Sequence, residues 1–319
     1  MTPSIKIRHK HNRPISQLCF GTVQLGIPYG IANRTGMPDE HISQELLRVA
    51  GDAGITLFDT ARAYGESERR VGDALRERDS ERITIMTKLS PLEDCTDPSA
   101  EAKVRESIET SLRNLGIASL PYVLLHRAAH LHAYSGAIWR ELLAFKKKGL
   151  VGKLGVSVAT PQETLEALSI PEVECLQLPY NILDWRWERS GIPEALAKRP
   201  NVLVLTRSAL LQGLLTQDSA WPVIPETQAA EVIHLLNGWV KEFGRRHRAD
   251  LCLAFVRGQG WIDSVVVGME TMAQLQENIA MFQTPPLSME ECTAIRARLP
   301  ELREALLNPA LWPKRPMPL

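Results

Sequence analysis

Eight short, strongly apolar runs recur along the chain at intervals that leave room for one helix between consecutive runs. Runs that are apolar throughout, instead of alternating with polar residues, are typical of strands in a sheet that is buried on both faces. The pattern therefore predicts eight buried strands that alternate with helices. The runs are QLCFGT (17–22), ITLFDTA (55–61), ITIMTKL (83–89), PYVLLHRA (121–128), KLGVSVA (153–159), ECLQLPYN (174–181), NVLVLTRSA (201–209) and WIDSVVVGM (261–269).

The stretches between these runs carry helix signals. Asp39 is placed to cap a helix over residues 41–53. The segment 160–163, Thr-Pro-Gln-Glu, is a capping box with proline at the first helical position. Three lysines at 146–148 close another helix. They can be interpreted as a basic patch, but we favour a cationic helix C-terminus, where positive charge complements the helix dipole.

Strand and helix alternate eight times, which favours an α/β fold of the (β/α)8 or TIM barrel type over a doubly wound sheet. No G-x-G-x-x-G follows the first strand, which also argues against a dinucleotide-binding Rossmann domain. The 319 residues suit one such barrel with insertions. We find no repeat or linker that divides the chain. We therefore expect a single barrel domain over residues 1–319, with one extra helix formed by the tail, residues 287–309.

The composition narrows the cellular setting. Lys plus Arg equals Asp plus Glu at 37 each, so nothing in the charge points to a nucleic-acid partner. The N-terminal residues 1–14 are basic but lack an apolar stretch behind them, and no run approaches the length of a membrane helix. The cysteines are scattered, form no C-x-x-C pair and favour a reducing cytoplasm over a disulfide framework. They are Cys19, Cys95, Cys175, Cys252 and Cys292.

Reactive groups in such a barrel gather at the C-terminal ends of the strands. The second run ends at Asp59 and is followed by Tyr64; the third ends at Lys88, and the fourth at His126. Burying a lysine is costly unless the ammonium has a partner. Asp59 on the neighbouring strand is the candidate partner for Lys88.

This arrangement predicts a proton donor. A cation beside a phenol stabilises the phenolate, so Tyr64 near Lys88 would act as general acid for a carbonyl oxygen that receives hydride. His126 would donate a hydrogen bond to the same oxygen. Taken singly, Asp59 is equally well a turn residue, Lys88 a structural lysine and His126 a core histidine. Their order on consecutive strands favours one common site.

A metal site is the competing interpretation for the histidines. The spacing of His126, His130 and His132 is compatible with coordination. No carboxylate or cysteine lies in the same segment, and His130 and His132 fall in a polar loop. We therefore expect no bound metal.

Several of these segments resemble a known family. FDTARAYGESE (58–68), the Thr87-Lys88 strand end and LLHRA (124–128) resemble the aldo-keto reductase superfamily, and the similarity extends from Leu18 to about Phe282. The resemblance implies a barrel enzyme that uses NADPH or NADH. It also implies a catalytic tetrad, formed by Asp59, Tyr64, Lys88 and His126.

The resemblance further implies a cofactor site along the strand ends. Thr271 and Gln274 also have capping-box spacing, and a helix N-terminus at this place is a natural phosphate site, so the two interpretations are compatible. The implied residues are Gly21, Thr22 and Val23 at the nicotinamide end; Ser157 and Gln177 at its carboxamide; Arg207, Ser208, Leu210, Gln212 and Gly213 at the nicotinamide face and the pyrophosphate; and Gly268, Thr271, Gln274, Glu277 and Asn278 at the adenosine end.

The sequence departs from the family pattern at three places. Val158 stands where an asparagine is common, and Arg207 replaces an aromatic residue that commonly stacks on the nicotinamide. A planar guanidinium can stack as well. Glu270 lies where many NADP-dependent members place Lys or Arg, and its carboxylate would repel a 2′-phosphate and accept from a ribose hydroxyl. We therefore expect NADPH, as is usual for the family, with NADH close behind.

Two segments are the expected substrate walls. They are the loop VQLGIPYGIANRTG (23–36) and the segment NILDWRW (181–187). Trp185 and Trp187 suit stacking on a sugar ring, although interface or packing roles remain equally open. Together these segments resemble a bacterial branch of the family that is associated with surface-sugar metabolism.

Four functions are compatible with these observations. The leading hypothesis is NAD(P)H-dependent reduction of an aldehyde, ketone or keto-sugar. The second is an NAD-dependent aldose dehydrogenase, the same chemistry in reverse. The third is a cofactor-binding regulatory subunit like the potassium-channel β subunits, against which the intact tetrad argues. The fourth is an unrelated barrel lyase or isomerase. The sequence leaves the natural substrate and the oligomeric state open.

Overall fold

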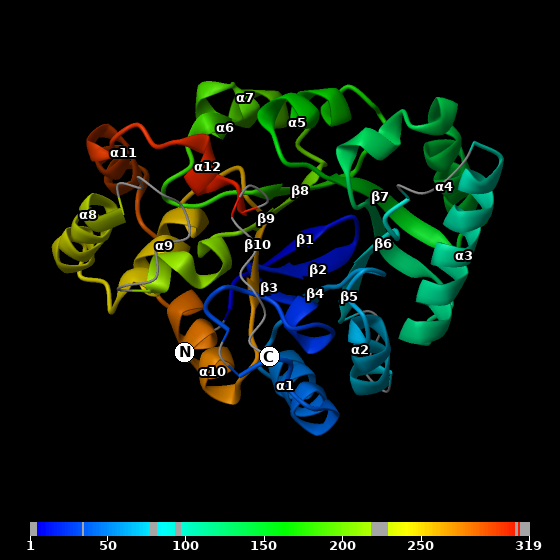
Figure 1. Cartoon of the computed structure of the whole chain (residues 1–319), viewed down its shortest axis with the longest axis horizontal. Coiled ribbons are helices and arrows are strands. Elements are labelled where there is room, and N and C mark those ends of the chain that lie inside the picture. Colours follow the sequence, from blue (N-terminus) through cyan, green and yellow to red (C-terminus); the bar gives the residue numbers. More distant parts are fainter. Residues whose placement is uncertain are drawn as a thin grey trace.

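Eight parallel strands close into a barrel in the order β10-β3-β4-β5-β6-β7-β8-β9 (Figure 1). The computed structural model describes residues 5–33, 35–76, 82–92, 97–217, 229–309 and 312. Each barrel strand lies within one of the eight predicted runs or begins just before it, which confirms the predicted barrel. The strands are β3 (Leu18–Gly21), β4 (Leu57–Asp59), β5 (Thr84–Lys88), β6 (Leu120–Leu125), β7 (Val151–Ser157), β8 (Cys175–Pro179), β9 (Leu203–Arg207) and β10 (Ser264–Gly268).

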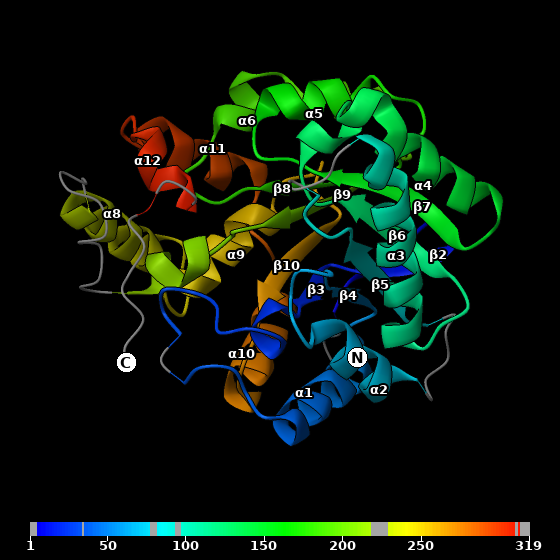
Figure 2. The same cartoon turned by 45° about the vertical axis from the view of Figure 1, so that its right-hand side comes forward.

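Helices lie around the outside of this barrel (Figure 2). Within the described part of the chain, no helix is long and apolar enough to cross a membrane. The α-helices are α1 (Glu40–Asp52), α2 (Ser67–Leu75), α3 (Asp97–Leu115), α4 (Ala137–Lys147), α5 (Pro161–Leu168), α6 (Arg186–Arg189), α7 (Ile192–Ala197), α8 (Ala229–Glu242), α9 (Arg248–Arg257), α10 (Met272–Phe282), α11 (Met289–Arg298) and α12 (Glu304–Leu307). Short 3-10 turns are η1 (Val23–Leu25), η2 (Ala128–Leu131), η3 (Tyr134–Gly136) and η4 (Leu211–Thr216).

The predicted helix signals act as expected. The Asp39 side chain accepts from the backbone N–H of Ile42 at the start of α1. Thr160 and Glu163 form the complete capping box of α5. Lys146, in the last turn of α4, pairs with Glu174. The lysines therefore close a helix, as favoured over a separate basic patch.

Strand register aligns the polar ends of the strands at one end of the barrel. Gly21 pairs with Asp59 across β3 and β4, and Ser157 pairs with Gln177 across β7 and β8. Below these residues the barrel interior is apolar. Its buried side chains are Ile15, Cys19, Leu57, Met86, Tyr122, Leu124, Cys175, Leu203 and Leu205. A packed interior of this kind leaves only the C-terminal rim for chemistry.

The N-terminal end of the barrel is closed by a hairpin that the sequence did not reveal. It consists of β1 (Ile7–Lys10) and β2 (Arg13–Ser16), joined through His11 and Asn12 with φ of 52° and 60°. Positive φ at both turn residues is the geometry of a type I′ hairpin turn. Ser16 donates its backbone N–H to Thr56 Oγ1 at 2.8 Å, which places the hairpin under β4.

The C-terminal tail forms two helices, α11 and α12, where one extra helix was expected. Pro300 follows the end of α11 by two residues and cannot continue a helix. Arg296 of α11 donates to the Tyr180 hydroxyl at 3.0 Å and also binds Glu188, so the tail is held against the segment that follows β8.

The described cysteines are free thiols buried in the fold. They are Cys19, Cys175, Cys252 and Cys292. Burial raises the pKa of the Cys252 thiol to about 12, which keeps it protonated and unreactive. The remaining cysteine of the sequence, Cys95, lies outside the described residues.

Candidate active site and cofactor pocket

A buried ion pair joins the ends of β4 and β5. The Lys88 ammonium donates to Asp59 Oδ1 at 2.6 Å and to Oδ2 at 2.8 Å. Gln177, across the barrel on β8, donates to the same Oδ1 at 2.8 Å. Burial, the largest single effect, would lower the pKa of Lys88, but the Asp59 carboxylate, together with Tyr64 and Cys19, outweighs it and the pKa is raised. The pair expected from the sequence is present, and its ammonium stays charged.

Tyr64 lies in front of this pair, in the loop between β4 and α2. Lys88 Nζ is 5.1 Å from the centroid of the Tyr64 ring. His126, which directly follows β6, packs edge-on against the same ring with centroids 5.8 Å apart and planes at 83°. The four residues of the predicted tetrad therefore lie together at the C-terminal rim, with Lys88 behind the other three.

His126 is held in its neutral form. Burial lowers the pKa of His126 to about 3, and the positive charges of Lys88 and Arg207 act in the same direction. Its Nδ1 is buried and has no hydrogen-bond partner in the described part of the chain. A neutral imidazole has one N–H to donate and one lone pair to accept, so His126 can act as a hydrogen-bond donor without carrying charge.

A fully buried carboxylate, Glu68 of α2, supports the tetrad through contacts next to Lys88. Its oxygens accept from the Thr87 hydroxyl at 2.7 Å, the Ser111 hydroxyl at 2.7 Å and Arg62 Nη1 at 2.6 Å. The Arg62 backbone N–H donates in turn to the Lys88 carbonyl at 3.1 Å. Glu68 is the last residue of the motif FDTARAYGESE, but its role is not evident from the sequence, because a glutamate at a helix start usually signals only capping.

Gly26 permits the first loop (residues 26–33) to touch the backbone at Tyr64. A Cβ at Gly26 would lie 1.7 Å from the Tyr64 carbonyl oxygen and 2.8 Å from Ser67 Cβ. Such separations are far inside van der Waals contact, so only glycine fits without moving the tyrosine loop. The position of Tyr64 thus depends on a residue that lies more than thirty positions earlier in the chain.

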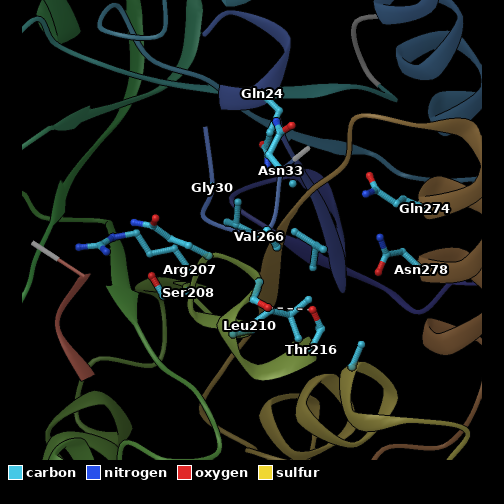
Figure 3. A pocket seen from close by; sticks show the side chains of 18 of the residues that line it. Gln24, Gly30, Asn33, Arg207, Ser208, Leu210, Thr216, Val266, Gln274 and Asn278 are labelled. Carbon is cyan, nitrogen blue, oxygen red and sulfur yellow. Dashed lines mark hydrogen bonds between the residues drawn. The ribbon is translucent and has the colours of Figure 1, made fainter. Parts of the chain in front are cut away.

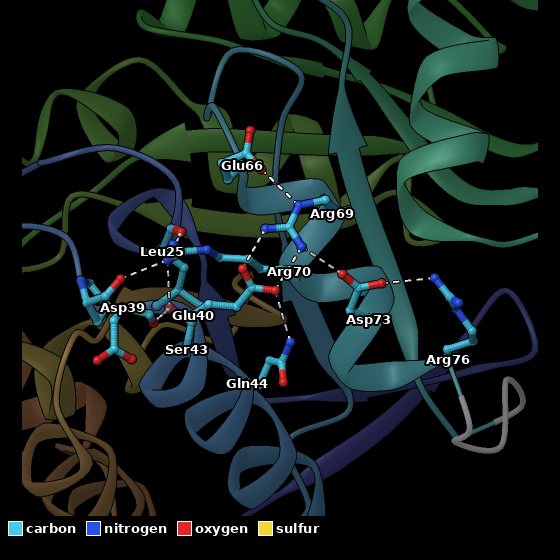
Figure 4. Close-up of polar contacts among 11 residues, drawn as sticks. Leu25, Asp39, Glu40, Ser43, Gln44, Glu66, Arg69, Arg70, Asp73 and Arg76 are labelled. Carbon is cyan, nitrogen blue, oxygen red and sulfur yellow. Dashed lines mark hydrogen bonds and ion pairs between the residues drawn. The ribbon is translucent and has the colours of Figure 1, made fainter.

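Two adjacent arginines of α2, Arg69 and Arg70, make polar contacts beside the first loop, and Arg70 holds the chain on both sides of it (Figure 4). Arg70 donates to the carbonyls of Leu25 at 2.9 Å and Pro38 at 2.8 Å, and to Ser43 Oγ at 2.8 Å. Because α2 also follows the tyrosine loop, one helix positions both loops. Arg69 makes ion pairs on the surface with Glu40, Glu66 and Asp73.

A pocket of about 1120 Å³ opens in front of the tetrad and extends to α10. Asp59, Tyr64 and His126 line one end of it. Figure 3 shows Arg207 on one side and Gln274 and Asn278 on the other, with Leu210 and Thr216 between them. Small-ligand sites usually measure about 300–1,000 Å³, so this volume suits a long ligand together with a small one.

The residues predicted to bind the cofactor line this pocket, with one exception. Thr271 is not among the lining residues, because its hydroxyl accepts the Gln274 backbone N–H at 3.2 Å and caps α10. The lining includes Gly21, Thr22, Val23, Ser157, Gln177, Arg207, Ser208, Leu210, Gln212, Gly213, Gly268, Gln274, Glu277 and Asn278.

Arg207 crosses the rim at the tetrad end of the pocket. It is the last residue of β9, and its Nη2 donates to the Val158 carbonyl, which follows β7, at 3.2 Å. Its guanidinium therefore passes over the end of β8. Val158 has an apolar, buried side chain, so it offers the pocket no hydrogen-bonding group where an asparagine is common in the family.

The segment after β9 has unusual backbone geometry. Ser208, Leu211 and Gln212 have φ of 62°, 46° and 55°. Such conformations are costly for residues with a Cβ and cluster at ligand-binding sites. A Cβ at Gly213 would lie 2.4 Å from the Cβ of Ala32, and the Ala32 N–H donates to the Gln212 carbonyl at 3.4 Å. The first loop thus lies across this strained segment.

The other end of the pocket carries charges of both signs. Glu270 is half-buried, accepts weakly from Gln274 Nε2 at 3.4 Å, and has its pKa raised by burial. Glu277 pairs with His247 at 2.8 Å. His247 also caps α9, where its side chain accepts the Asp250 backbone N–H.

A basic wall at this end of the pocket is not evident from the sequence. Lys241, Arg246, His247 and Arg248 line the pocket from α8, α9 and their connection. In the sequence, Arg246, His247 and Arg248 belong to an ordinary polar stretch, RRHRAD (245–250), that resembles a solvated helix junction, and Lys241 lies four residues before it. Only the packing of α9 beside β10 brings them to the pocket, and no local pattern signals that.

Residues from one of the two expected substrate walls line the pocket. Val23, Gln24, Tyr29, Gly30 and Asn33 of the loop after β3 line the pocket. The expectation for NILDWRW (181–187) is wrong, because the described lining includes none of these residues.

The tryptophans of this segment are engaged elsewhere. Trp187 is fully buried and donates to Asp184 at 3.3 Å. Trp185 carries the Arg189 guanidinium 3.8 Å from its ring centroid. Both tryptophans have the packing role that the sequence left open.

Comparison with known proteins agrees with this geometry. An NADH-specific methylglyoxal reductase from Escherichia coli is 26% identical over 325 residues, covering 92% of this chain and 96% of the relative. Aldo-keto reductase str7 from Strobilurus tenacellus is 28% identical over 308 residues, covering 88% of each chain. Both relatives are similar along nearly their whole length.

A solved structure shows the same fold, and a family model matches most of the chain. Aldo-keto reductase AKR11C1 from Bacillus halodurans superposes with a TM-score of 0.75 over 95% of this chain and all of its own, at 24% identity, and thus shares the fold. The model of the aldo/keto reductase family matches residues 17–299. The chain belongs to the aldo/keto reductase family and is an NAD(P)-dependent oxidoreductase.

Proposed function

We propose that the protein reduces the carbonyl of a small aldehyde, ketone or keto-sugar, with Tyr64 as the proton donor. One observation carries the proposal: a buried, charged Lys88–Asp59 pair lies directly behind Tyr64, and a neutral His126 lies edge-on beside it. Tyr64 and His126 both line the pocket, so one substrate oxygen can meet both groups.

Each tetrad residue then has a distinct task. Tyr64 gives its proton to the carbonyl oxygen as that oxygen gains negative charge. The Lys88 ammonium stabilises the phenolate that remains, and Asp59 keeps that ammonium charged and in place. Neutral His126 donates a hydrogen bond to the same oxygen and orients the carbonyl.

The pocket residues fit a nicotinamide dinucleotide. When bound, the cofactor supplies the hydride. Ser157 and Gln177 would hold the carboxamide, the segment 208–213 the pyrophosphate, and Gln274 and Asn278 the adenosine. Gln24 Oε1, a buried acceptor in this pocket without a hydrogen-bond partner in the described structure, supports a polar ligand there.

We propose NADPH as the cofactor, with NADH accepted as well. Lys241 and Arg246 supply positive charge at the adenosine end, which favours a 2′-phosphate. Glu270 acts against it, because a carboxylate repels phosphate. The E. coli relative is named as NADH-specific, which makes comparison of the two cofactors the first experiment.

The second candidate is an NAD-dependent aldose dehydrogenase, in which the same residues work in the oxidative direction. Glu270 favours it, because a carboxylate at this position accepts from the ribose hydroxyls of NAD⁺. Strong selection for NADP over NAD would exclude this candidate.

The test is absorbance at the nicotinamide band with NADPH or NADH and a panel of small aldehydes, ketones and keto-sugars. We expect substrate-dependent loss of absorbance with at least one pair. In parallel, quenching of tryptophan fluorescence measures the binding of each cofactor. Absence of any cofactor binding would refute the oxidoreductase site, and binding without turnover of any carbonyl would instead favour a regulatory role.

We further propose that this single-domain enzyme works in the cytoplasm. The free and buried thiols of the described cysteines support a reducing compartment.

A further inference from the structure

The tetrad end of the pocket contains one charge that has no counter-ion. Lys88 is neutralised by Asp59, and His126 is uncharged. Arg207 lines the same end, and no carboxylate of the described residues lies within 4.0 Å of its guanidinium. The net charge that faces a ligand at this end is therefore positive and concentrated on Arg207.

Carboxylates near Arg207 are occupied by other partners. Asp59 accepts two bonds from Lys88 and one from Gln177. Glu163 is bound to the backbone N–H groups of Ala159 and Thr160 in the capping box of α5. The guanidinium itself is held in position across the rim by its bond to the Val158 carbonyl at 3.2 Å.

Burial is the main cause of the low pKa of His126, and the charges of Lys88 and Arg207 lower it further. The pocket end that holds Tyr64, Ser157 and Gln177 is also where the proposed function places the nicotinamide ring. That ring carries a positive charge in NAD(P)⁺ and none in NAD(P)H. A fixed cation at short range, in a partly buried site, repels only the oxidised form.

Resting on the proposed function, we propose that Arg207 makes the site select the reduced cofactor and helps to expel the oxidised one. An aromatic residue would stack on either form. A guanidinium stacks equally well on the ring but adds its charge. The protein would thus bind NAD(P)H in preference to NAD(P)⁺ and release the spent cofactor after reduction.

The proposal is tested by isothermal titration calorimetry with the oxidised and the reduced form of each cofactor. We expect the wild type to bind the reduced form at least tenfold more tightly. Arg207→Gln and Arg207→Met remove the charge and should lower this preference at least tenfold, chiefly by tighter binding of the oxidised form. Arg207→Lys keeps the charge and should keep most of the preference.

Arg246→Gln is the matched control, because it removes a cation that lines the other end of the pocket. It should weaken both forms alike and leave their ratio unchanged. A tenfold change in the ratio corresponds to about 30 mV in the potential of the bound couple, which gives an independent readout.

The outcomes separate this inference from the proposed function. Equal affinity of the wild type for both forms overturns the role of Arg207, and so does an unchanged ratio in its neutral variants. If the neutral variants melt at a lower temperature but keep the wild-type affinity ratio, Arg207 serves only to hold the fold together through its hydrogen bond to Val158. If neither form binds to the wild type, the proposed function fails instead.

Discussion

Lys88 donates to both carboxylate oxygens of Asp59 at a place where the two residues are only 1% and 4% exposed. Two charges buried this deeply lose their hydration, and each is tolerable only because the other is present. Removing one partner of the pair should therefore cost stability as well as the support of the proposed proton donor, and these two effects can be separated by mutation.

Lys88→Met should lower the free energy of unfolding by about 3–5 kcal/mol, because it leaves the Asp59 carboxylate buried without a counter-ion. The double variant Lys88→Met with Asp59→Asn should be more stable than the single one, although both should lack reductase activity. Urea unfolding measures the difference. Additive effects of the two substitutions would show that the pair is not coupled.

Tyr64→Phe should reduce kcat by about 10²–10⁴-fold, the range usual for a lost general acid. The affinity for the reduced cofactor should stay within about twofold, because the phenol hydroxyl faces the substrate and not the adenosine end. Steady-state kinetics and fluorescence titration give the two numbers. A variant that keeps more than about a tenth of the wild-type kcat would contradict the assignment.

His126 should give the protein a distinctive dependence on acid. Its pKa is about 3 in the folded state and about 6.5 when unfolded, so below pH 6.5 the unfolded chain binds a proton that the folded one does not. Stability should therefore fall as the pH drops from about 6.5 toward 3. His126→Asn should show a weaker fall in urea unfolding across this window, and equal slopes would contradict the low pKa.

Gly26→Ala should destabilise the protein by about 1–3 kcal/mol and lower kcat, since the new Cβ must displace the backbone at Tyr64. Gly238→Ala in α8 is the matched control, because its Cβ would meet nothing within 4 Å. Gly238→Ala should leave activity intact and should slightly raise the stability of the folded protein. Thermal melts and steady-state kinetics on both variants measure these effects. Equal stability and kcat of the two variants would contradict the close contact at Gly26.

Glu270→Gln should shift cofactor choice toward NADPH. Removing the carboxylate ends its repulsion of a 2′-phosphate, and the amide oxygen can still meet a ribose hydroxyl. We expect the ratio of kcat/KM for NADPH over NADH to rise about fivefold. This corresponds to about 1 kcal/mol, the upper value for an interaction between partly exposed charges. No change in this ratio would place the 2′ position away from Glu270.

The barrel, and the meeting of Asp59, Tyr64, Lys88 and His126 at its rim, could be predicted from local pattern. Strands buried on both faces must be apolar along their whole length, and Asp59 and Lys88 are conspicuous because each interrupts such a run at its end. Helix caps such as Thr160 are local as well, since the residues that satisfy them lie three positions apart. These features need no knowledge of distant contacts.

Other features depend on contacts that no local pattern encodes. The strands of the β1–β2 hairpin are four residues long and largely polar, so they resemble a basic tail. Trp187 resembles a sugar platform until its burial is known. Arg246 reaches the pocket only because α9 packs beside β10. In each case the partner lies far away in sequence.

The hairpin has a practical consequence for use of the protein on a solid support. It covers the strand starts, while the pocket opens at the opposite rim of the barrel. A linker attached at the exposed Ile7 would hold the molecule with its mouth directed away from the surface. Immobilised in this way, the enzyme should exchange cofactor and product with a flowing solution without obstruction.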